Sequence, residues 1–509
     1  MISRRTTLKA LGFTSLTSGL ILGFPAVTSA QAPQKPLQIP TQAFGELEGN
    51  SRRFQLTLQR GSSSFLPGLQ TETIGINGSY LGPTLRFHRN EEVSLSVTNQ
   101  LGEPSTLHWH GFHLPAIQDG GPHQTIENSA TWNPSFTVVQ FAGTFWYHSH
   151  MLDTAGEQVY RGLAGMIIVD DEQQQLPLPD MYGVDDIPLI IQDRRFNADG
   201  SFNYLSSFED TVMGVHGDTI LVNGTVNAQL QITRRLVRFR ILNGSNARTY
   251  TLAFDDNREF FQIASDGGLL DSPVGLIRLE LAPAERAEIL VALAPGEQLR
   301  LINVGRDPTF PEFPGGMSSM MRALNAQSFD LLTLSAAASL EGENAIPGQL
   351  TSIYRLPAAA ATNTRRFVLA MGAGMRSGSD RGPGTGMRNG LGGGYGGGNF
   401  SINGRRMVED FINERIVMNT TEIWEIQNTS PMMHPFHVHN GQFQLLDRNG
   451  SPPPANEMGW KDTVRIESGE LVRIIMRFTD FTDEEHPYMY HCHILEHEDR
   501  GMMGQFLVV

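Results

Sequence analysis

The chain has 509 residues, a formal net charge of −15 and a single cysteine. At roughly 150 residues per domain this length predicts about three domains with ample core. The negative charge argues against nucleic acid or an anionic membrane surface as a partner. With one cysteine no disulfide can form within the chain, so the thiol of Cys492 needs another explanation.

The first thirty residues have the pattern of an export signal. Paired arginines, Arg4 and Arg5, precede an apolar stretch that ends at Val27, and small residues follow up to residue 30. The arginine pair is similar to a twin-arginine signal, and an ordinary secretory signal is the alternative. The apolar stretch is short for a spanning helix and is interrupted by glycines. We therefore expect an exported or periplasmic protein without a membrane anchor in the mature chain.

Beyond the signal, short runs with alternating apolar residues are separated by glycine, proline and asparagine. Residues 54–58 and 93–97 are examples, and this pattern is typical of antiparallel β-sandwiches. Long helical periodicity is not evident. We predict an all-β chain of three sandwich domains, over residues 31–172, 173–345 and 346–509.

Eight of the fifteen histidines fall into four His-x-His pairs: His108 and His110, His148 and His150, His437 and His439, and His491 and His493. On a strand, residues i and i+2 point to the same face, so each pair can present two imidazoles to one site. One such pair is more often a packing feature, but four pairs indicate metal binding. Two pairs lie in the first domain and two in the third. We expect a metal cluster between those domains, with the second domain as a structural brace.

Cys492 lies between the two histidines of the last pair, so strand alternation points its thiol away from both imidazoles. Adjacent residues can therefore serve two separate metal centres. The nearby residues that can complete a site with Cys492 are His434, His497 and Met502. Two histidines, one thiolate and a weakly bound methionine are the ligands of a blue-copper electron-transfer site. A buried structural cysteine is the alternative.

Four segments, residues 108–111, 146–150, 434–439 and 491–497, resemble the copper-binding segments of multicopper oxidases. The resemblance extends over all three predicted domains and implies that each is a cupredoxin-like Greek-key sandwich. It also implies an enzyme that takes single electrons from a reducing substrate and reduces O2 to water. A cell-division relative keeps the fold but has lost copper ligands. Every ligand position is filled here, which favours an enzyme over a copper-binding or structural protein.

The resemblance implies four copper ions, held by twelve residues of this chain, and we expect the chain to act as a monomer. The type 1 copper would be held by His434, Cys492, His497 and Met502, and the type 2 copper by His108 and His437. One type 3 copper would be held by His110, His148 and His493, and the other by His150, His439 and His491.

Two carboxylates match acidic positions near the trinuclear cluster of this family, Asp119 and Glu498. Reduction of O2 to water consumes protons, so both are candidate proton donors. The alternatives are a turn-forming aspartate before glycine and a solvated glutamate. The remaining histidines match no ligand position and are expected to be structural or to lie on the surface: His88, His113, His123, His216 and His486.

The substrate is suggested by methionines in two irregular segments, 311–321 and the glycine-rich 372–398. Thioethers are soft ligands suited to Cu(I), and the pattern partly resembles the methionine-rich insert of periplasmic cuprous oxidases. However, Ser430 stands where those enzymes carry an acidic residue. Oxidation of phenols or aromatic amines, as in bacterial laccases, is the alternative. The methionines in question are Met317, Met320, Met321, Met371, Met375, Met387 and Met407.

Overall fold

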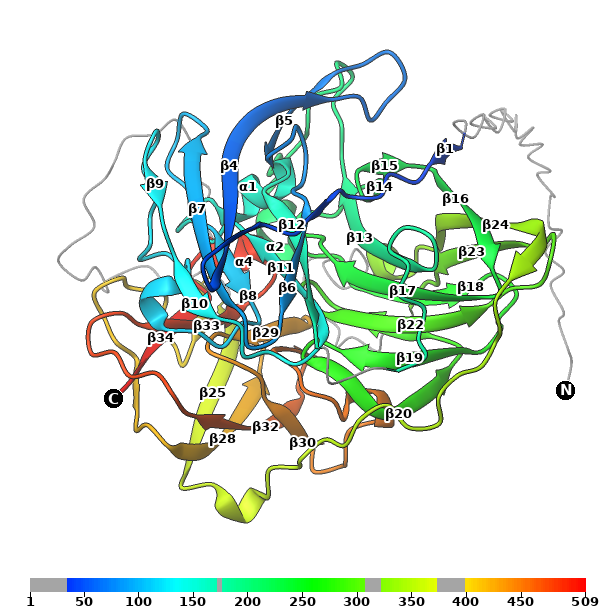
Figure 1. The fold of residues 1–509 in the computed structure, drawn as a ribbon. Coiled ribbons are helices and arrows are strands. Elements are labelled where there is room, and N and C mark those ends of the chain that lie inside the picture. The colour runs from blue at the N-terminus through cyan, green and yellow to red at the C-terminus, as the bar shows by residue number, and fades with distance from the viewer. Residues whose placement is uncertain (1–33, 172–175, 307–321, 373–398) are drawn as a thin grey trace, which may run out of the picture. The chain divides into compact units, whose positions relative to one another are not determined.

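The structure is a computed structural model that describes residues 34–171, 176–306, 322–372 and 399–509. The predicted signal, all of 311–321 and all of 372–398 except Gly372 lie outside these residues. The expected Met317, Met320, Met321, Met375 and Met387 therefore lie outside them as well. Within them the chain forms six sheets and few, short helices (Figure 1), which confirms the predicted all-β class. No helix of the described part has the length and apolar character needed to cross a membrane.

The first sandwich encloses a core built from Phe54, Leu95, Phe145 and their buried neighbours. Its strands show the predicted alternation: in β7 every second residue is buried. One sheet contains β3 (Glu46–Glu48), β4 (Ser51–Ser63), β5 (Thr71–Ile76), β7 (Glu92–Gln100), β9 (Thr131–Trp132) and β10 (Ser135–Thr137). The other contains β2 (Gln42–Ala43), β6 (Thr84–His88), β8 (His108–His110), β11 (Gly143–His148) and β12 (Ala164–Asp170). The short helices are η1 (Ala116–Gln118) and α1 (Ala155–Arg161).

The second sandwich, green in Figure 1, has its own core. One sheet contains β1 (Lys35–Pro36), β16 (Ala228–Arg234), β18 (Tyr250–Phe254), β21 (Leu279–Leu281), β23 (Gln298–Asn303) and β24 (Phe329–Glu341). The other contains β13 (Asp186–Arg194), β14 (Thr219–Val222), β15 (Thr225–Val226), β17 (Leu236–Asn243), β19 (Phe260–Ser265), β20 (Gly268–Leu276) and β22 (Arg286–Ala292). Helix α2 (Phe208–Met213) begins with a capping box at Ser207. The first strand, β1, had been expected in the first domain, but it pairs with β16 of this sandwich.

The third sandwich, yellow to red in Figure 1, is built around a core that includes Trp424, Phe436 and Phe506. One sheet contains β25 (Asn363–Gly372), β26 (Asn399–Ile402), β28 (Thr420–Asn428), β30 (Gln444–Arg448) and β32 (Leu471–Phe478). The other contains β27 (Glu414–Ile416), β29 (His434–Val438), β31 (Thr463–Ile466), β33 (Tyr488–Cys492) and β34 (Met503–Val508). The short helices are η2 (Ala358–Ala360), η3 (Ala455–Glu457) and α4 (Leu495–Glu498).

A buried cluster of ion pairs joins the first and second sandwiches. Glu288 of β22 accepts hydrogen bonds from Thr144 Oγ1 at 2.8 Å, from Arg240 Nη1 at 2.8 Å and from Arg238 Nε at 2.9 Å. Burial alone would raise the pKa of Glu288, but the two guanidinium groups lower it to about 2. The carboxylate is therefore ionised in the folded protein at neutral pH.

We expect Glu288→Gln to lower the free energy of unfolding at pH 7 by about 3–5 kcal/mol, because two buried guanidinium groups lose their shared anion. Since the folded pKa lies below the ordinary value of 4.5, this stability is present above pH 4.5 and is lost as the pH falls towards 2. Denaturant unfolding of the metal-free proteins should show the difference shrinking over that range. The exposed Glu341→Gln, whose ion pair with Arg234 lies at the surface, should cost no more than about 1 kcal/mol. Equal losses of unfolding free energy in Glu288→Gln and Glu341→Gln would contradict the stabilising role of the buried Glu288 ion pairs.

Candidate metal centres

Strand register brings the four histidine pairs together. In the first sandwich His108 of β8 lies opposite His148 of β11. In the third, His437 of β29 lies opposite His491 of β33. The eight imidazoles are all buried, and rings from the two sandwiches stack on each other, with the centroids of His110 and His437 3.7 Å apart. The expected cluster between the first and third domains is thus present as a group of buried imidazoles.

In the imidazoles of His108 and His437, one ring nitrogen makes a hydrogen bond and the other has no partner. Nδ1–H of His108 donates to the carbonyl of Asp119 at 2.9 Å, and Nδ1–H of His437 donates to the carbonyl of Asp462 at 2.8 Å. Both Nε2 atoms are buried and have no hydrogen-bond partner. A buried nitrogen lone pair without a partner is costly unless a ligand takes it. These two residues are the predicted type 2 ligands.

Three further imidazoles converge through their Nε2 atoms. The Nε2 of His491 lies 3.2 Å from that of His150 and 3.3 Å from that of His439. Carboxylates lie behind the rings: Asp119 Oδ2 accepts from His439 Nδ1–H at 2.6 Å, and the Glu498 oxygens lie 3.2 Å from His150 Nδ1 and 3.1 Å from His491 Nδ1. This is one of the two predicted type 3 sets, and its donor atoms are close enough to hold one metal ion.

The other predicted type 3 set is partly assembled. His110 Nδ1 lies 3.3 Å from His148 Nε2, and the His148 Nδ1–H donates to the carbonyl of Ser149 at 2.8 Å. The ring of His493 lies beside both, with centroids 5.1 and 5.3 Å away, and neither of its nitrogens has a partner. The donor atoms grouped with His110 and His148 include His108 rather than His493.

The predicted type 1 residues form a separate buried group in the third sandwich. Cys492 Sγ lies 3.3 Å from His434 Nδ1 and 3.7 Å from His497 Nδ1. Met502 is fully buried, its backbone carbonyl accepts from the Cys492 N–H at 3.0 Å, and its N–H donates to His497. His497 lies in the short helix α4.

In the two type 1 histidines, the Nε2 atoms, which point away from Cys492, also have hydrogen-bond partners. His434 Nε2 lies 2.6 Å from Ser430 Oγ, so Ser430 occupies the position behind this imidazole. His497 Nε2–H donates at 3.0 Å to the carbonyl of Val212, which belongs to helix α2 of the second sandwich. The ring of Phe400 stacks on His497, with centroids 4.4 Å apart. Neither the Val212 carbonyl nor Phe400 carried a sequence signal.

The pKa shifts of these side chains suit metal binding. Burial lowers the pKa of His150 in the cluster to about 4 and that of the type 1 residue His497 to about 3, so both imidazoles are neutral at neutral pH. Burial raises the pKa of the Cys492 thiol, which therefore ionises only when a cation binds beside it. Imidazole, thiolate and thioether donors together suit copper.

The two candidate carboxylates have opposite pKa shifts. Burial raises the pKa of Asp119 well above 3.8, and its Oδ1 is buried without a hydrogen-bond partner. For Glu498, burial opposes ionisation, but His150 and His491 lower the pKa to about 2. Glu498 is buried rather than solvated. Asp119 ends helix η1 and precedes Gly120, as the turn-forming alternative expects, and its side chain also contacts His439.

A small cavity of about 40 Å³ is lined in part by residues that neighbour the type 1 residues in sequence. Three methionines line it, Met213 of α2 together with Met432 and Met433, which directly precede His434. His216, expected to be structural, and Glu467 line it as well. Sequence analysis missed Met213, which is far from the copper motifs along the chain. Of the methionines expected from the irregular segments, Met371 packs against the third core and Met407 N–H donates to the Gly501 carbonyl.

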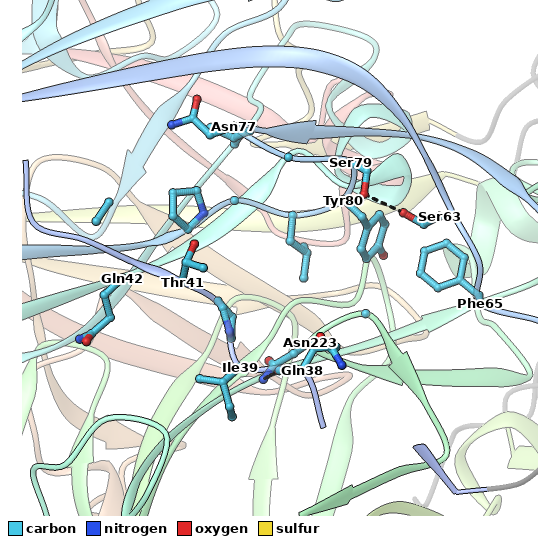
Figure 2. A pocket seen from close by; sticks show the side chains of 18 of the residues that line it. Gln38, Ile39, Thr41, Gln42, Ser63, Phe65, Asn77, Ser79, Tyr80 and Asn223 are labelled. Atoms are coloured by element: carbon cyan, nitrogen blue, oxygen red, sulfur yellow. Dashed lines mark hydrogen bonds between the residues drawn. The ribbon is translucent and has the colours of Figure 1, made fainter. Parts of the chain in front are cut away.

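A larger pocket, of about 490 Å³, lies between the first and second sandwiches and away from the histidines. Figure 2 shows Phe65 and Tyr80 near each other in it, with a hydrogen bond between Ser63 and Ser79. Its lining contains no charged side chain and none of the predicted site residues. We assign it no part in the metal chemistry.

The chain is similar to known proteins over most of its length. Family models described as multicopper oxidase match residues 57–174 and 392–509. The chain is 33% identical over 476 residues to multicopper oxidase mco of Staphylococcus haemolyticus, covering 92% of this chain and 91% of that protein. It is 34% identical to cell division protein FtsP of Sodalis glossinidius, covering 100% of this chain and 98% of that protein.

Solved structures show the same similarity. A multi-copper oxidase from Pediococcus acidilactici superposes with a TM-score of 0.79 at 35% identity, covering 94% of this chain and 92% of that chain. McoA multicopper oxidase from the hyperthermophile Aquifex aeolicus superposes with a TM-score of 0.80 at 32% identity, covering 94% and 99%.

Proposed function

Because the chain belongs to the multicopper oxidase family, we propose that it couples one-electron oxidation of a substrate to the four-electron reduction of O2 to water. The supporting observation is that two separate groups of buried donor atoms are joined by adjacent residues of β33. Cys492 belongs to one group and His491 to the other. The backbone between them spans on the order of ten Å through bonds, which is a short path for an electron.

We assign four copper ions to the twelve predicted ligands. When bound, copper would supply one-electron transfer beside Cys492 and the binding and reduction of O2 among the histidines. The protein supplies neutral imidazoles, a thiol that ionises on metal binding and a buried site that excludes bulk water. Asp119 Oδ1, buried and unpartnered, can hold a proton next to His439.

A non-catalytic role is the competing proposal, because similar relatives are named cell division protein FtsP. The predicted ligands favour the enzyme: all twelve are present and buried, and ten of them have donor atoms grouped with those of other predicted ligands. The test is O2 consumption by the copper-loaded protein with a reductant. A copper-replete chain that consumes no O2 with either Cu(I) or a phenol would contradict the enzyme reading.

For the substrate we propose Cu(I), with phenols or aromatic amines as the alternative. The cavity lined by Met213, Met432 and Met433 holds about 40 Å³, far less than the roughly 300–1,000 Å³ of sites that enclose organic ligands. Its methionine thioethers are soft donors suited to a cuprous ion. Met213 also adjoins Val212, whose carbonyl holds His497.

We expect Met213→Leu and Met432→Leu each to lower kcat/KM for Cu(I) by about tenfold, equivalent to about 1.4 kcal/mol of transition-state stabilisation. Leucine keeps the volume but removes the soft sulfur donor, so kcat/KM for a phenol should not fall. Met166→Leu, in the buried contact between the first two sandwiches, is the matched control. Parallel losses for both substrates, or none for Cu(I), would favour the laccase alternative.

We also propose that the protein is exported as a folded chain and acts outside the cytoplasm. This rests on the arginine pair and apolar stretch of residues 1–30.

A further inference from the structure

The imidazole of His110 is turned opposite to its neighbours in the cluster. Its Nδ1 faces the cluster, 3.3 Å from His148 Nε2, while its Nε2 lies 3.0 Å from Asp462 Oδ1. The cluster imidazoles whose Nδ1–H instead makes the outward hydrogen bond are those of His108, His148, His437, His439 and His491. Something in the structure must therefore select the other tautomer at His110.

Asp462 is held behind His110 by an arginine of the second sandwich. Arg286 Nη1 donates to Asp462 Oδ1 at 2.7 Å and Nη2 donates to Oδ2 at 2.6 Å. Both side chains are completely buried. The guanidinium is itself fixed, because Nε donates to the carbonyl of Thr144 at 3.1 Å and Nη2 donates to that of Asp266 at 2.9 Å. Thr144 lies on β11, the strand that ends at His148.

Hydrogen-bond chemistry then determines the proton on His110. Arginine is only a donor, and Arg286 donates to both oxygens of Asp462, which favours the carboxylate over the buried acid. A carboxylate is only an acceptor, so the His110 nitrogen that faces it must carry hydrogen. The second neighbour of that nitrogen, Thr463 Oγ1 at 3.3 Å, donates its own hydrogen to Asp462 Oδ1 at 3.0 Å and so offers only lone pairs. Both contacts leave the Nδ1 lone pair directed at the cluster.

The glycine after His110 leaves room for this arrangement. Gly111 has φ of +86°, and a Cβ there would lie 2.4 Å from Asp462 Oδ2 and 3.0 Å from Arg286 Nη2. Any side chain at this position would displace the carboxylate. The glycine of the His-Trp-His-Gly segment thus has a physical role that depends on Arg286 and Asp462.

We propose that Arg286 is a positioning residue that acts through Asp462 to hold His110 as the Nε2–H tautomer, with Nδ1 available to copper. The proposal rests on the assignment of His110 as a copper ligand. It gives the second sandwich, which was expected to be only a brace, a direct part in building the metal centre.

The test compares Arg286→Lys and Asp462→Asn with Arg240→Lys. Lysine keeps the charge but loses the two-pronged contact, and asparagine cannot accept from both Arg286 and His110 without placing its amide hydrogens against a donor. Arg240 makes an equally buried ion pair with Asp186, at 2.7 Å, and touches no cluster histidine. Copper per chain after dialysis against a chelator, the blue band and thermal unfolding of the metal-free proteins are measured.

We expect Arg286→Lys and Asp462→Asn to keep the blue band but to retain cluster copper about 10- to 100-fold more weakly. Arg240→Lys should retain its copper even if it is equally destabilised. Adding Asp462→Asn to His110→Ala should cause no further copper loss, because both changes act on one contact. If Arg286→Lys does not fold, Gly111→Ala takes its place, and its copper retention is compared with that of Arg240→Lys. We expect Gly111→Ala to retain cluster copper more weakly.

Wild-type retention in Arg286→Lys and Asp462→Asn, or an equal loss in Arg240→Lys, would overturn the role of Arg286. A wild-type chain that takes up no copper would refute the proposed function instead, so the two failures are distinguishable.

Discussion

Cys492→Ser is expected to abolish both the blue colour and the oxidase activity of the copper-loaded protein. Cys492 is the only thiol in the chain and lies 3.3 and 3.7 Å from the nitrogens of His434 and His497. The intense colour of such sites depends on a thiolate bound to copper. A serine hydroxyl is a hard and weakly acidic donor that cannot replace it.

The effect should be confined to the type 1 group. Serine is only slightly smaller than cysteine, and the third core encloses this fully buried position. The fold and the histidine cluster should therefore persist. Visible spectra, copper per chain and O2 consumption with Cu(I) and with a phenol are the measurements. We expect about one copper equivalent to be lost and O2 consumption to fall to background with both reductants. An intense visible band in the variant would refute the assignment of Cys492.

Much of the metal centre could be predicted because strand geometry is local. The alternation along His491 and Cys492 requires only that the segment be a strand, and β33 places the two side chains in different donor groups. The pairing of β8 with β11 and of β29 with β33 then aligns the histidine pairs in register. The third predicted ligand of this run, His493, follows the end of the strand. Its nitrogens are not grouped with those of His110 and His148.

The surroundings of the ligands could not be predicted, because they come from contacts distant in sequence. Arg286 and Asp462 are 176 residues apart, and the carbonyl of Val212 reaches His497 across 285 residues. A weak signal existed for Arg286, since an arginine within the apolar strand β22 must find a buried partner. The partner itself, and its contact with His110, depend on how the second and third sandwiches pack together.

The two carboxylates at the cluster were predicted to share one role, and their contacts support different ones. Asp119 Oδ2 accepts from His439, and Oδ1 makes no hydrogen bond, with His108 Nδ1 3.5 Å away. The buried site raises the pKa of Asp119. Glu498 lies between His150 and His491 and is held ionised, with a pKa of about 2. We infer that Asp119 holds a proton for delivery to bound oxygen, whereas Glu498 orients two imidazoles.

Asp119→Asn should therefore retain copper, because the amide oxygen still accepts from His439, but should lower kcat by about 10²-fold or more through loss of the proton-holding oxygen. In the wild type the protonated form of Asp119 is depleted as pH rises through its raised pKa, so kcat should fall with rising pH, and this fall should be absent in Asp119→Asn. Glu498→Gln should keep the wild-type pH dependence and instead weaken copper retention, since the anion behind His150 and His491 is lost. Measurement of kcat against pH at saturating reductant, together with copper per chain, separates the two effects. If Asp119→Asn has the kcat and pH profile of the wild type, Asp119 does not deliver a proton and its role is structural.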